Sequence, residues 1–544
     1  MNTQSVDSGA TLTSLKGLQL LRTPHRTTNV VSINTVRHER LFVISCLAAY
    51  VVLAVLLANV RPPQSDEGHF AEGAMEIATT GRFIIPTWTA WLPTLNRHVF
   101  VAMPLYFFSL AAWFRVFGIS MLSMRYFSVL WGTVLVFAYY VVVRKISRDR
   151  RTTWLVLLLM VFNYDLINLT TARYDGMAAA LSACGLAAYA ALRERHLSLA
   201  LFAANACIAV AAMTHPYGAL GFGYLLILFL VLDRKQFRPS YLALVAIPYV
   251  IALFSWTLYI SQDVIMFKSQ FLSNAQPHKT SLLHPLSLLV SELHERYWVL
   301  FAGMRAGVPA YMRLKLGILI LYLISFIAAV LTPTIRKNKA SSALLACAMF
   351  GFLALTMGEG SRLYNYLVHV IALYSIVLAI CLRHLRSLGR PHRAIVAVIV
   401  CGVGSFTLAS IAYRVRLNSY NKAYLPAADY LNQHVRDAQL VFAGGEFVFP
   451  LSCDRHLLDD PQLGYANQRH ADYIVMGNAY DSKFQRERSQ DPKLYNYMDR
   501  ILHTYRLVFA SRAGLDYYRV YASPDLPIQQ QSAKSNVEAA PVGF

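Results

Sequence analysis

Acidic and basic side chains stand in the polar stretches that follow long apolar segments. Adjacent Asp66 and Glu67 come directly after the first apolar segment, and His98 lies further along the same polar stretch. Arg173 and Asp175 follow a later apolar segment in the sequence Ala-Arg-Tyr-Asp. Carboxylates beside lipid are costly, and they are usually functional. We therefore expect these residues to take part in chemistry.

Three further polar side chains stand at other boundaries of apolar segments, namely His215, Arg362 and Tyr364. A carboxylate can accept the proton of an incoming hydroxyl group. A guanidinium group can bind a phosphate through two parallel hydrogen bonds. An acid, a base and a cation on one side of a helical bundle are the groups that a transfer reaction needs.

Each of these residues also has a structural interpretation. Asp66 and Asp175 stand where helices are predicted to begin, and Asp is a favoured N-cap. Glu67 suits the positive end of a helix dipole. His215 is typical of a histidine at the membrane interface, and Arg362 of a side chain that reaches lipid headgroups. The sequence leaves these alternatives open for each residue taken alone.

The composition indicates a membrane protein built of helices. Of the 544 residues, 56% are hydrophobic and 15% are charged, whereas soluble domains carry about 25% charged residues. The apolar runs are continuous rather than alternating, which argues against a barrel. The net charge of +21 falls largely in short loops between apolar runs, so orientation in a membrane explains it better than nucleic-acid binding.

Cysteine usage points to neither disulfides nor a thiolate zinc site. The seven cysteines form no Cys-x-x-Cys pair. Six lie in apolar segments, and Cys453 stands alone near the end of the chain.

Eleven membrane-spanning helices are predicted from the lengths of the apolar runs. A basic arm at residues 1–40 and the short basic loops are predicted to be cytoplasmic, and the other loops extracytoplasmic. The transmembrane region covers 41–412, with its first outer loop at 61–123. The predicted spans lie near 41–60, 124–143, 153–170, 176–192, 198–213, 217–232, 241–260, 313–332, 340–357, 363–382 and 394–412.

The first outer loop is predicted to contain two helical stretches. Residues 67–80 form an amphipathic pattern that Ser65 or Asp66 can cap and Gly81 can end. Residues 101–117 are apolar enough to span, but a span there would reverse the sidedness of every later basic loop. We therefore expect that segment to lie in the membrane interface.

Residues 413–522 are predicted to form a small extracytoplasmic α/β domain. Helical patterns occur at 427–434 and 494–504, and strand patterns at 439–443, 473–476, 507–510 and 517–521. Residues 523–544 are polar and are predicted to be disordered.

The order of several motifs resembles the membrane glycosyltransferases of the GT-C fold. The nearest branch is the protein O-mannosyltransferase-like group, which includes the lipid A aminoarabinose transferases. The resemblance covers residues 41–415 and rests on DEGHFAEGAMEIATTGRFIIP, on MPLYFF with a following Phe117-Gly118, on the segment around Arg125, and on ARYD.

The resemblance implies roles for individual residues. Asp66 would be the general base toward the acceptor hydroxyl, with inversion at the sugar carbon, and Asp175 would support the site, in some members near a metal. Arg362 and Tyr364 stand where members have basic and aromatic residues near the lipid phosphate. The implied donor is a sugar on a polyprenyl phosphate, and the acceptor is a lipid, a glycan or a protein.

The chain departs from the family pattern at two places. The stretch Phe100–Tyr106 lacks the lysine found in relatives, for which His98 or Arg97 could substitute. An acidic residue that contributes to zinc binding in the aminoarabinose branch is also absent. We therefore predict neither that sugar nor a tight metal site, and a divalent metal is left open.

The resulting hypothesis is a multi-pass glycosyltransferase of the bacterial inner membrane. Asp66, Glu67 and Asp175 are the candidate catalytic residues. The candidate substrate-binding residues are Arg173, His98, His215, Arg362 and Tyr364. The alternative is a transporter or flippase for a lipid-linked or small anionic solute, which would place ionisable residues in mid-span and repeat broken helices in two halves.

Overall fold

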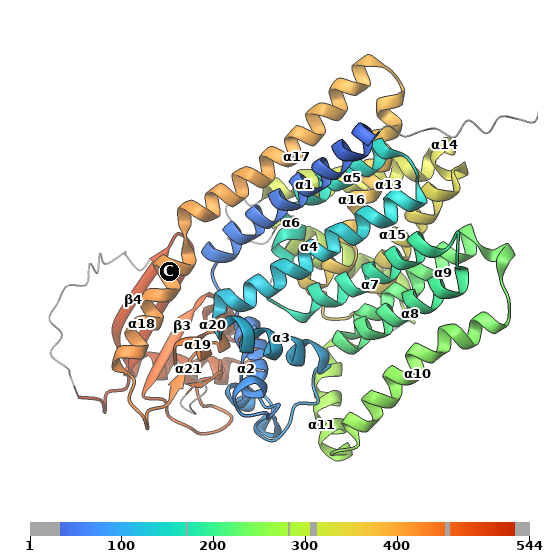
Figure 1. Ribbon diagram of the computed structural model, residues 1–544. Helices are drawn as coiled ribbons and strands as arrows, with labels where there is room; N and C mark the ends of the chain where they lie inside the picture. Colours follow the sequence, from blue (N-terminus) through green and yellow to red (C-terminus); the bar gives the residue numbers. More distant parts are fainter. Residues whose placement is uncertain (1–32, 170–171, 281–282, 305–312, 452–456, 528–544) are drawn as a thin grey trace, which may run out of the picture. The chain divides into compact units, whose positions relative to one another are not determined.

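The computed structural model describes residues 33–169, 172–280, 283–304, 313–451 and 457–527 (Figure 1). The description below concerns the compact unit that begins at Ser45, together with the helix that leads into it. Most of the predicted basic arm, Cys453 and the greater part of the predicted disordered tail lie outside the described residues.

Seven helices of the described part are long and apolar enough to cross a membrane. They are α1 (Ile33–Val60), α4 (Met121–Ile146), α7 (Tyr174–Leu192), α8 (Leu197–Thr214), α10 (Ser240–Ile260), α15 (Lys339–Gly358) and α17 (Arg390–Leu417). Three shorter apolar helical segments are α3 (Leu105–Phe117), η3 (Pro216–Ala219) with α9 (Leu220–Leu232), and α13 (Lys315–Leu331). The predicted helical membrane bundle is confirmed, but the count of eleven spans is not.

Two predicted spans consist of shorter helices. The segment near 153–170 divides into α5 (Arg150–Val161) and α6 (Tyr164–Leu169). The side chain of Asn163 accepts a hydrogen bond from the Leu166 N–H at 2.9 Å, so a new helix starts there. The segment near 363–382 begins as η8 (Tyr364–His369) and continues as α16 (Ile371–Ser387).

The remaining helices of this region lie in loops between the apolar helices. They are η1 (Pro86–Ala90), η2 (Pro93–Asn96), η4 (Arg234–Gln236), α11 (Val264–Ala275), η5 (Gln276–His278), α12 (Pro285–Ser291), the π-helix η6 (Glu292–Phe301) and α14 (Pro333–Lys337).

The amphipathic helix α2 (Ser65–Thr79) begins at a cap that sequence reasoning did not identify. Gln64, rather than Ser65 or Asp66, is the N-cap residue, and its backbone N–H donates to Glu67 Oε2 at 3.1 Å. Glu67 is also held by Arg61 and by Arg125 Nη2, the latter at 2.8 Å. All three charged side chains are buried, so this ion-pair group fixes the start of α2 against α1 and α4.

Two faces of α2 contact different parts of the protein. Ser65 and His69, four residues apart and thus on one face, contact Asp459 of the C-terminal domain. Asp66 and Phe70, displaced by one position, contact Arg173 of the helical bundle. The helix therefore joins the two regions through two adjacent faces.

The C-terminal domain contains a five-stranded sheet with the order β2-β1-β3-β5-β4. The pairs β1–β2 and β1–β3 are parallel, and β3–β5 and β4–β5 are antiparallel. The strands are β1 (Val441–Phe442), β2 (Leu457–Leu458), β3 (Tyr473–Gly477), β4 (Arg506–Ala513) and β5 (Asp516–Ala522). Its helices are η9 (Tyr420–Tyr424), α18 (Leu425–His434), η10 (Gly445–Phe447), α19 (Val448–Leu451), α20 (Asn478–Gln490) and α21 (Pro492–Thr504).

The predicted small α/β domain is therefore confirmed, with several additions. Every predicted strand and helix of this region has a counterpart, whereas the short helices η9, η10 and α19 were not predicted, and neither were β2 and α20. The strand β2 is only two residues long, and α20 is polar along most of its length. Neither carries the apolar periodicity on which sequence reasoning depends.

A hydrogen-bond network around Asp459 connects α2 to the C-terminal domain, which Figure 1 shows beside that helix. Asp459 Oδ2 accepts from the Ser65 hydroxyl at 2.5 Å and lies 2.9 Å from His69 Nε2. Its Oδ1 accepts from the Tyr480 hydroxyl at 2.9 Å. Although burial alone would raise the pKa of Asp459, these partners, His69 first, hold its pKa below the usual value.

Replacing Glu67 with Gln should destabilise the protein strongly. The change leaves two buried guanidinium groups without their shared anion, a situation that costs about 3–5 kcal/mol. We expect a clearly lower thermal unfolding midpoint for the detergent-purified E67Q variant. The exposed Glu194→Gln variant is the control. An unchanged midpoint in E67Q would show that the ion-pair group does not support the fold.

Replacing Asp459 with Asn should loosen the C-terminal domain from α2. Hydrogen bonds to a charged group contribute about 1.5–3 kcal/mol each, and this carboxylate accepts several. We expect faster amide hydrogen exchange in both α2 and η10, measured by mass spectrometry. The exposed Asp437→Asn variant should exchange like the wild type. Equal exchange in D459N and the wild type would contradict the role of this network.

Candidate active site

Arg173 connects the two predicted catalytic aspartates. Its guanidinium forms an ion pair with Asp66 through Nη1, and its Nε donates to Asp175 Oδ2 at 2.9 Å. The Arg173 side chain is 3% exposed and the Asp175 side chain 1%, whereas the Asp66 side chain is 44% exposed. Asp66 is thus the member of this group that an incoming molecule can reach.

The rings around Arg173 restrict where its guanidinium can lie. The rings of Phe70 and Tyr174 lie 5.4 and 5.6 Å from its guanidinium carbon, a distance typical of cation–π contacts. Arg173 occupies the N-cap position of α7, so Asp175 lies in the first turn, where a helix favours negative charge. The sequence Ala-Arg-Tyr-Asp therefore places a cation and an anion side by side at one helix start.

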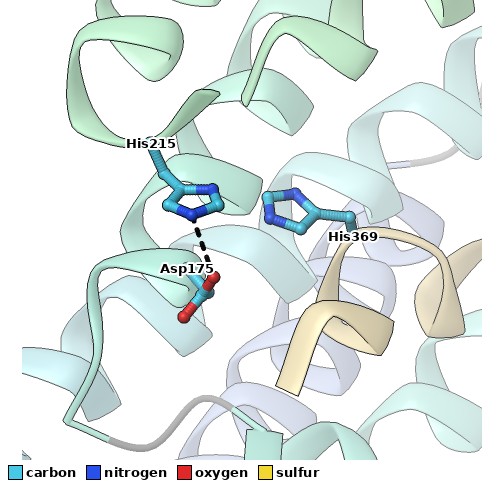
Figure 2. A group of neighbouring side chains, drawn as sticks. All are labelled: Asp175, His215 and His369. Carbon is cyan, nitrogen blue, oxygen red and sulfur yellow. Dashed lines mark ion pairs between the residues drawn. The ribbon is translucent and has the colours of Figure 1, made fainter. Parts of the chain in front are cut away.

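Asp175 also belongs to a buried group with two histidines (Figure 2). One ligand atom from each of Asp175, His215 and His369 lies within 4.8 Å of the others, and His215 Nε2 is 3.7 Å from Asp175 Oδ1. Figure 2 shows both imidazoles directed toward the same space above the carboxylate. His215 precedes η3, and His369 ends η8.

The electrostatics of this group favour uncharged imidazoles. His215 and His369 are both buried, which disfavours the protonated form of each ring. Asp175 Oδ1 and His369 Nε2 are buried and have no hydrogen-bond partner within the described residues. Neutral imidazole nitrogen and carboxylate oxygen are the atoms that divalent metals such as zinc bind.

The other predicted site residues lie elsewhere. Glu67 is in the ion-pair group at the start of α2. The ring of His98 packs against those of Phe100 and Tyr259, with distances between ring centroids of 4.5 and 5.3 Å. Arg362 Nη1 donates to Glu292 Oε2 at 3.0 Å and to the Thr356 and Glu359 carbonyls. Arg362 is therefore part of a buried ion pair with Glu292, and none of these contacts involves Asp66.

Tyr364 belongs to a further polar group that borders a cavity. Its hydroxyl donates to Asp165 Oδ1 at 2.5 Å, and Lys315 Nζ lies 3.3 Å from the same hydroxyl and 2.5 Å from Asp165. Lys315 lines a cavity of about 620 Å³. The other lining residues are mostly apolar and include Tyr164, Leu300, Phe301, Leu314 and Phe406. The cavity thus combines a cationic group with an apolar wall.

Sequence reasoning missed His369, Lys315 and Asp165. His369 ends a short helix inside a segment predicted as a span, so its position looked unremarkable. Asp165 stands inside another predicted span, where a carboxylate is costly enough to be a signal of function. Lys315 begins α13 close to the predicted span boundary. The charge of Asp165 and of Lys315, each inside or at the edge of an apolar run, is the signal that could have identified these two residues.

No protein-family model matches the chain, and no curated protein sequence matches it either. Solved structures do. ArnT from Cupriavidus metallidurans, bound to undecaprenyl phosphate, is 16% identical and aligns over 89% of this chain and 98% of its own, with a TM-score of 0.56.

Two structures of an archaeal enzyme are also similar. The oligosaccharyltransferase of Archaeoglobus fulgidus in complex with Zn and sulfate is 13% identical, and the alignment covers 89% of this chain and 74% of that one, with a TM-score of 0.52. The oligosaccharyltransferase AglB of the same organism, in complex with an inhibitory peptide and a dolichol-phosphate, is 12% identical, with coverages of 90% and 75% and a TM-score of 0.51.

These proteins are membrane glycosyltransferases of the GT-C fold. The similarity extends over most of this chain and includes both the helical bundle and the C-terminal domain. Together with the seven apolar helices, it shows a multi-pass membrane protein. The chain therefore has the GT-C fold, as the order of its motifs predicted.

Proposed function

We propose that this protein is a glycosyltransferase that moves a sugar from a polyprenyl-phosphate donor to an acceptor hydroxyl. Its fold is shared with ArnT, which was crystallised with undecaprenyl phosphate, and with AglB, which was crystallised with dolichol-phosphate and a peptide. The proposed location is the bacterial inner membrane. The active site and residues 413–522 would be extracytoplasmic, and residues 1–40 would be cytoplasmic.

The observation that carries the proposal is the accessible Asp66 carboxylate held by a buried arginine. Its ion pair with Arg173 fixes the direction in which the carboxylate points. In the proposed reaction, Asp66 accepts the proton of the acceptor hydroxyl. The acceptor oxygen forms a bond to the anomeric carbon, and the bond from that carbon to the phosphate oxygen breaks. A single displacement of this kind inverts the sugar carbon.

The leaving phosphate would be stabilised by cationic and hydroxyl groups. Lys315 lines the amphipathic cavity, whose apolar wall suits a polyprenyl chain, and the Tyr364 hydroxyl lies beside the Lys315 ammonium group. The resemblance implies that Arg362 lies near the lipid phosphate. To bind that phosphate, Arg362 would have to give up its ion pair with Glu292. The geometry therefore favours Lys315 and Arg414, two cations that line this cavity, as the groups that contact the phosphate.

A divalent cation would be held by Asp175, His215 and His369. The donor set of two imidazoles and one carboxylate suits zinc, and two of the donor atoms are buried without a partner within the described residues. One adjustment is required, because His215 Nδ1 accepts from the Tyr217 N–H at 3.2 Å. Binding through Nε2 places the proton on Nδ1 and breaks that hydrogen bond. A bound cation would supply positive charge beside Asp175.

Replacing Asp66 with Asn tests the proposed reaction. The amide keeps the size of the side chain but cannot accept the proton, so transfer should fall by about 100-fold or more. The measurement is the amount of sugar-loaded carrier lipid, by mass spectrometry, in a deletion strain that expresses each variant. We expect the loaded carrier to accumulate both in the deletion strain and with D66N, and not with Asp437→Asn.

The proposal fails if D66N clears the loaded carrier as fast as the wild type. Equal amounts of folded D66N and wild-type protein in the membrane must be confirmed by immunoblot and thermal unfolding. If no loaded carrier accumulates even in the deletion strain, the donor assignment is wrong, and the transporter alternative is favoured.

Replacing His369 with Ala tests the metal site. The change removes one of three ligands, so zinc affinity should fall by at least 10-fold. We expect about one zinc per wild-type chain by elemental mass spectrometry after purification with zinc, and much less in H369A. The exposed His503→Ala variant should retain the wild-type content. Equal zinc content in H369A would mean that these residues hold no metal.

A further inference from the structure

A small cavity lies where the chain enters α2 and meets the C-terminal domain. One wall is formed by residues 62–65, which end at the residue before Asp66. The opposite wall comes from η10, from the start of α20 and from β5. The cavity has a volume of about 210 Å³, which leaves room for one small polar unit rather than for a lipid chain.

Glu446 gives this cavity a polar group that lacks a partner. It is 6% exposed, it lines the cavity, and its Oε2 has no hydrogen-bond partner within the described residues. Its Oε1 lies 3.4 Å from the Tyr518 hydroxyl. Burial, together with the charge of Asp459, raises the pKa of Glu446 to about 7. Near neutral pH its carboxyl group can therefore donate or accept a hydrogen bond.

The remaining lining combines aromatic rings with hydrogen-bonding groups. Tyr517 and Tyr518 contribute aromatic rings, and Asn478 and Asp516, which are hydrogen-bonded to each other at 3.2 Å, contribute an amide and a carboxylate. Aromatic walls with a few convergent polar groups are typical of sites that bind small molecules. A sugar ring fits this combination, because its C–H faces pack on aromatic rings and its hydroxyls pair with amides and carboxylates.

The charge of the lining excludes one class of ligand. Asp516 is paired with Arg414, but the Oε2 of Glu446 has no partner within the described residues, and among those residues no lysine or arginine lines the cavity. A phosphate or a sugar acid would meet like charge in a partly buried site. An uncharged, hydroxyl-rich unit would instead satisfy the open atom of Glu446.

We propose that this cavity is an acceptor subsite that holds one uncharged sugar ring, on the face of α2 that meets the C-terminal domain. This inference rests on the proposed transferase function and specifies the acceptor as a carbohydrate. Ser65, at the rim, is hydrogen-bonded to Asp459 and to the Gly445 N–H. The C-terminal domain therefore holds both walls of the subsite in place. Asp66 is the next residue along the chain and faces the helical bundle, so an acceptor would extend from the subsite past the start of α2 to reach it.

Binding of free sugars to the full-length protein tests the inference without requiring turnover. The probes are glucose, galactose, mannose and N-acetylglucosamine, with glucuronate as the anionic comparison, in saturation-transfer NMR on protein in nanodiscs. Ala479→Trp fills the cavity from its exposed rim, and Ser482→Trp adds the same ring elsewhere on α20. Glu446→Gln removes the acidic group without changing its size.

We expect at least one neutral sugar to give a clear signal with the wild type and a several-fold weaker signal for glucuronate. The neutral-sugar signal should fall at least fivefold in A479W and should be altered in E446Q. It should remain in S482W and in D66N. The inference is wrong if no neutral sugar binds, or if A479W binds as the wild type does. Since D66N retains the subsite, loss of transfer in that variant tests the reaction separately.

Discussion

The buried guanidinium of Arg173 is the constraint on which the candidate active site depends. Burying an isolated charge is very costly, and one partner is seldom enough to offset that cost. Arg173 has two, Asp66 from α2 and Asp175 from α7, and aromatic rings cover its remaining surface. The first and second predicted outer loops are therefore held together by one ion-pair group, and the exposed side of Asp66 follows from that arrangement.

The helix α2 brings the C-terminal domain into the same arrangement. One face carries Asp66, and the next carries Ser65 and His69, both in contact with Asp459. The backbones of α2 and η10 approach closely here, since a Cβ atom at Gly68 would overlap the carbonyl group of Gly445. Glycine is required at position 68 because no side chain fits, and a displacement of the domain would also displace the start of α2.

Buried charges in this protein divide into two kinds. Arg362 and Arg296 are paired with Glu292 and Glu359, and all four side chains are almost fully buried. Such groups connect segments of the chain and would have to break apart to bind a ligand. Lys315 and Asp66 also have partners, but one borders a cavity and the other is accessible. Accessibility, rather than residue type or pairing, therefore separates structural charges from candidate ligand-binding ones.

Local pattern alone determined the helical membrane class, the helix α2 and most strands of the C-terminal domain, because each depends on neighbouring residues. Only the tertiary structure decided which distant groups meet. Arg173 and Asp66 are 107 residues apart, and Ser65 and Asp459 are 394 apart. No periodicity links such positions, since packing of separate helices brings them together. For the same reason His369 joined the candidate site, while Glu67 proved to be held by two buried arginines.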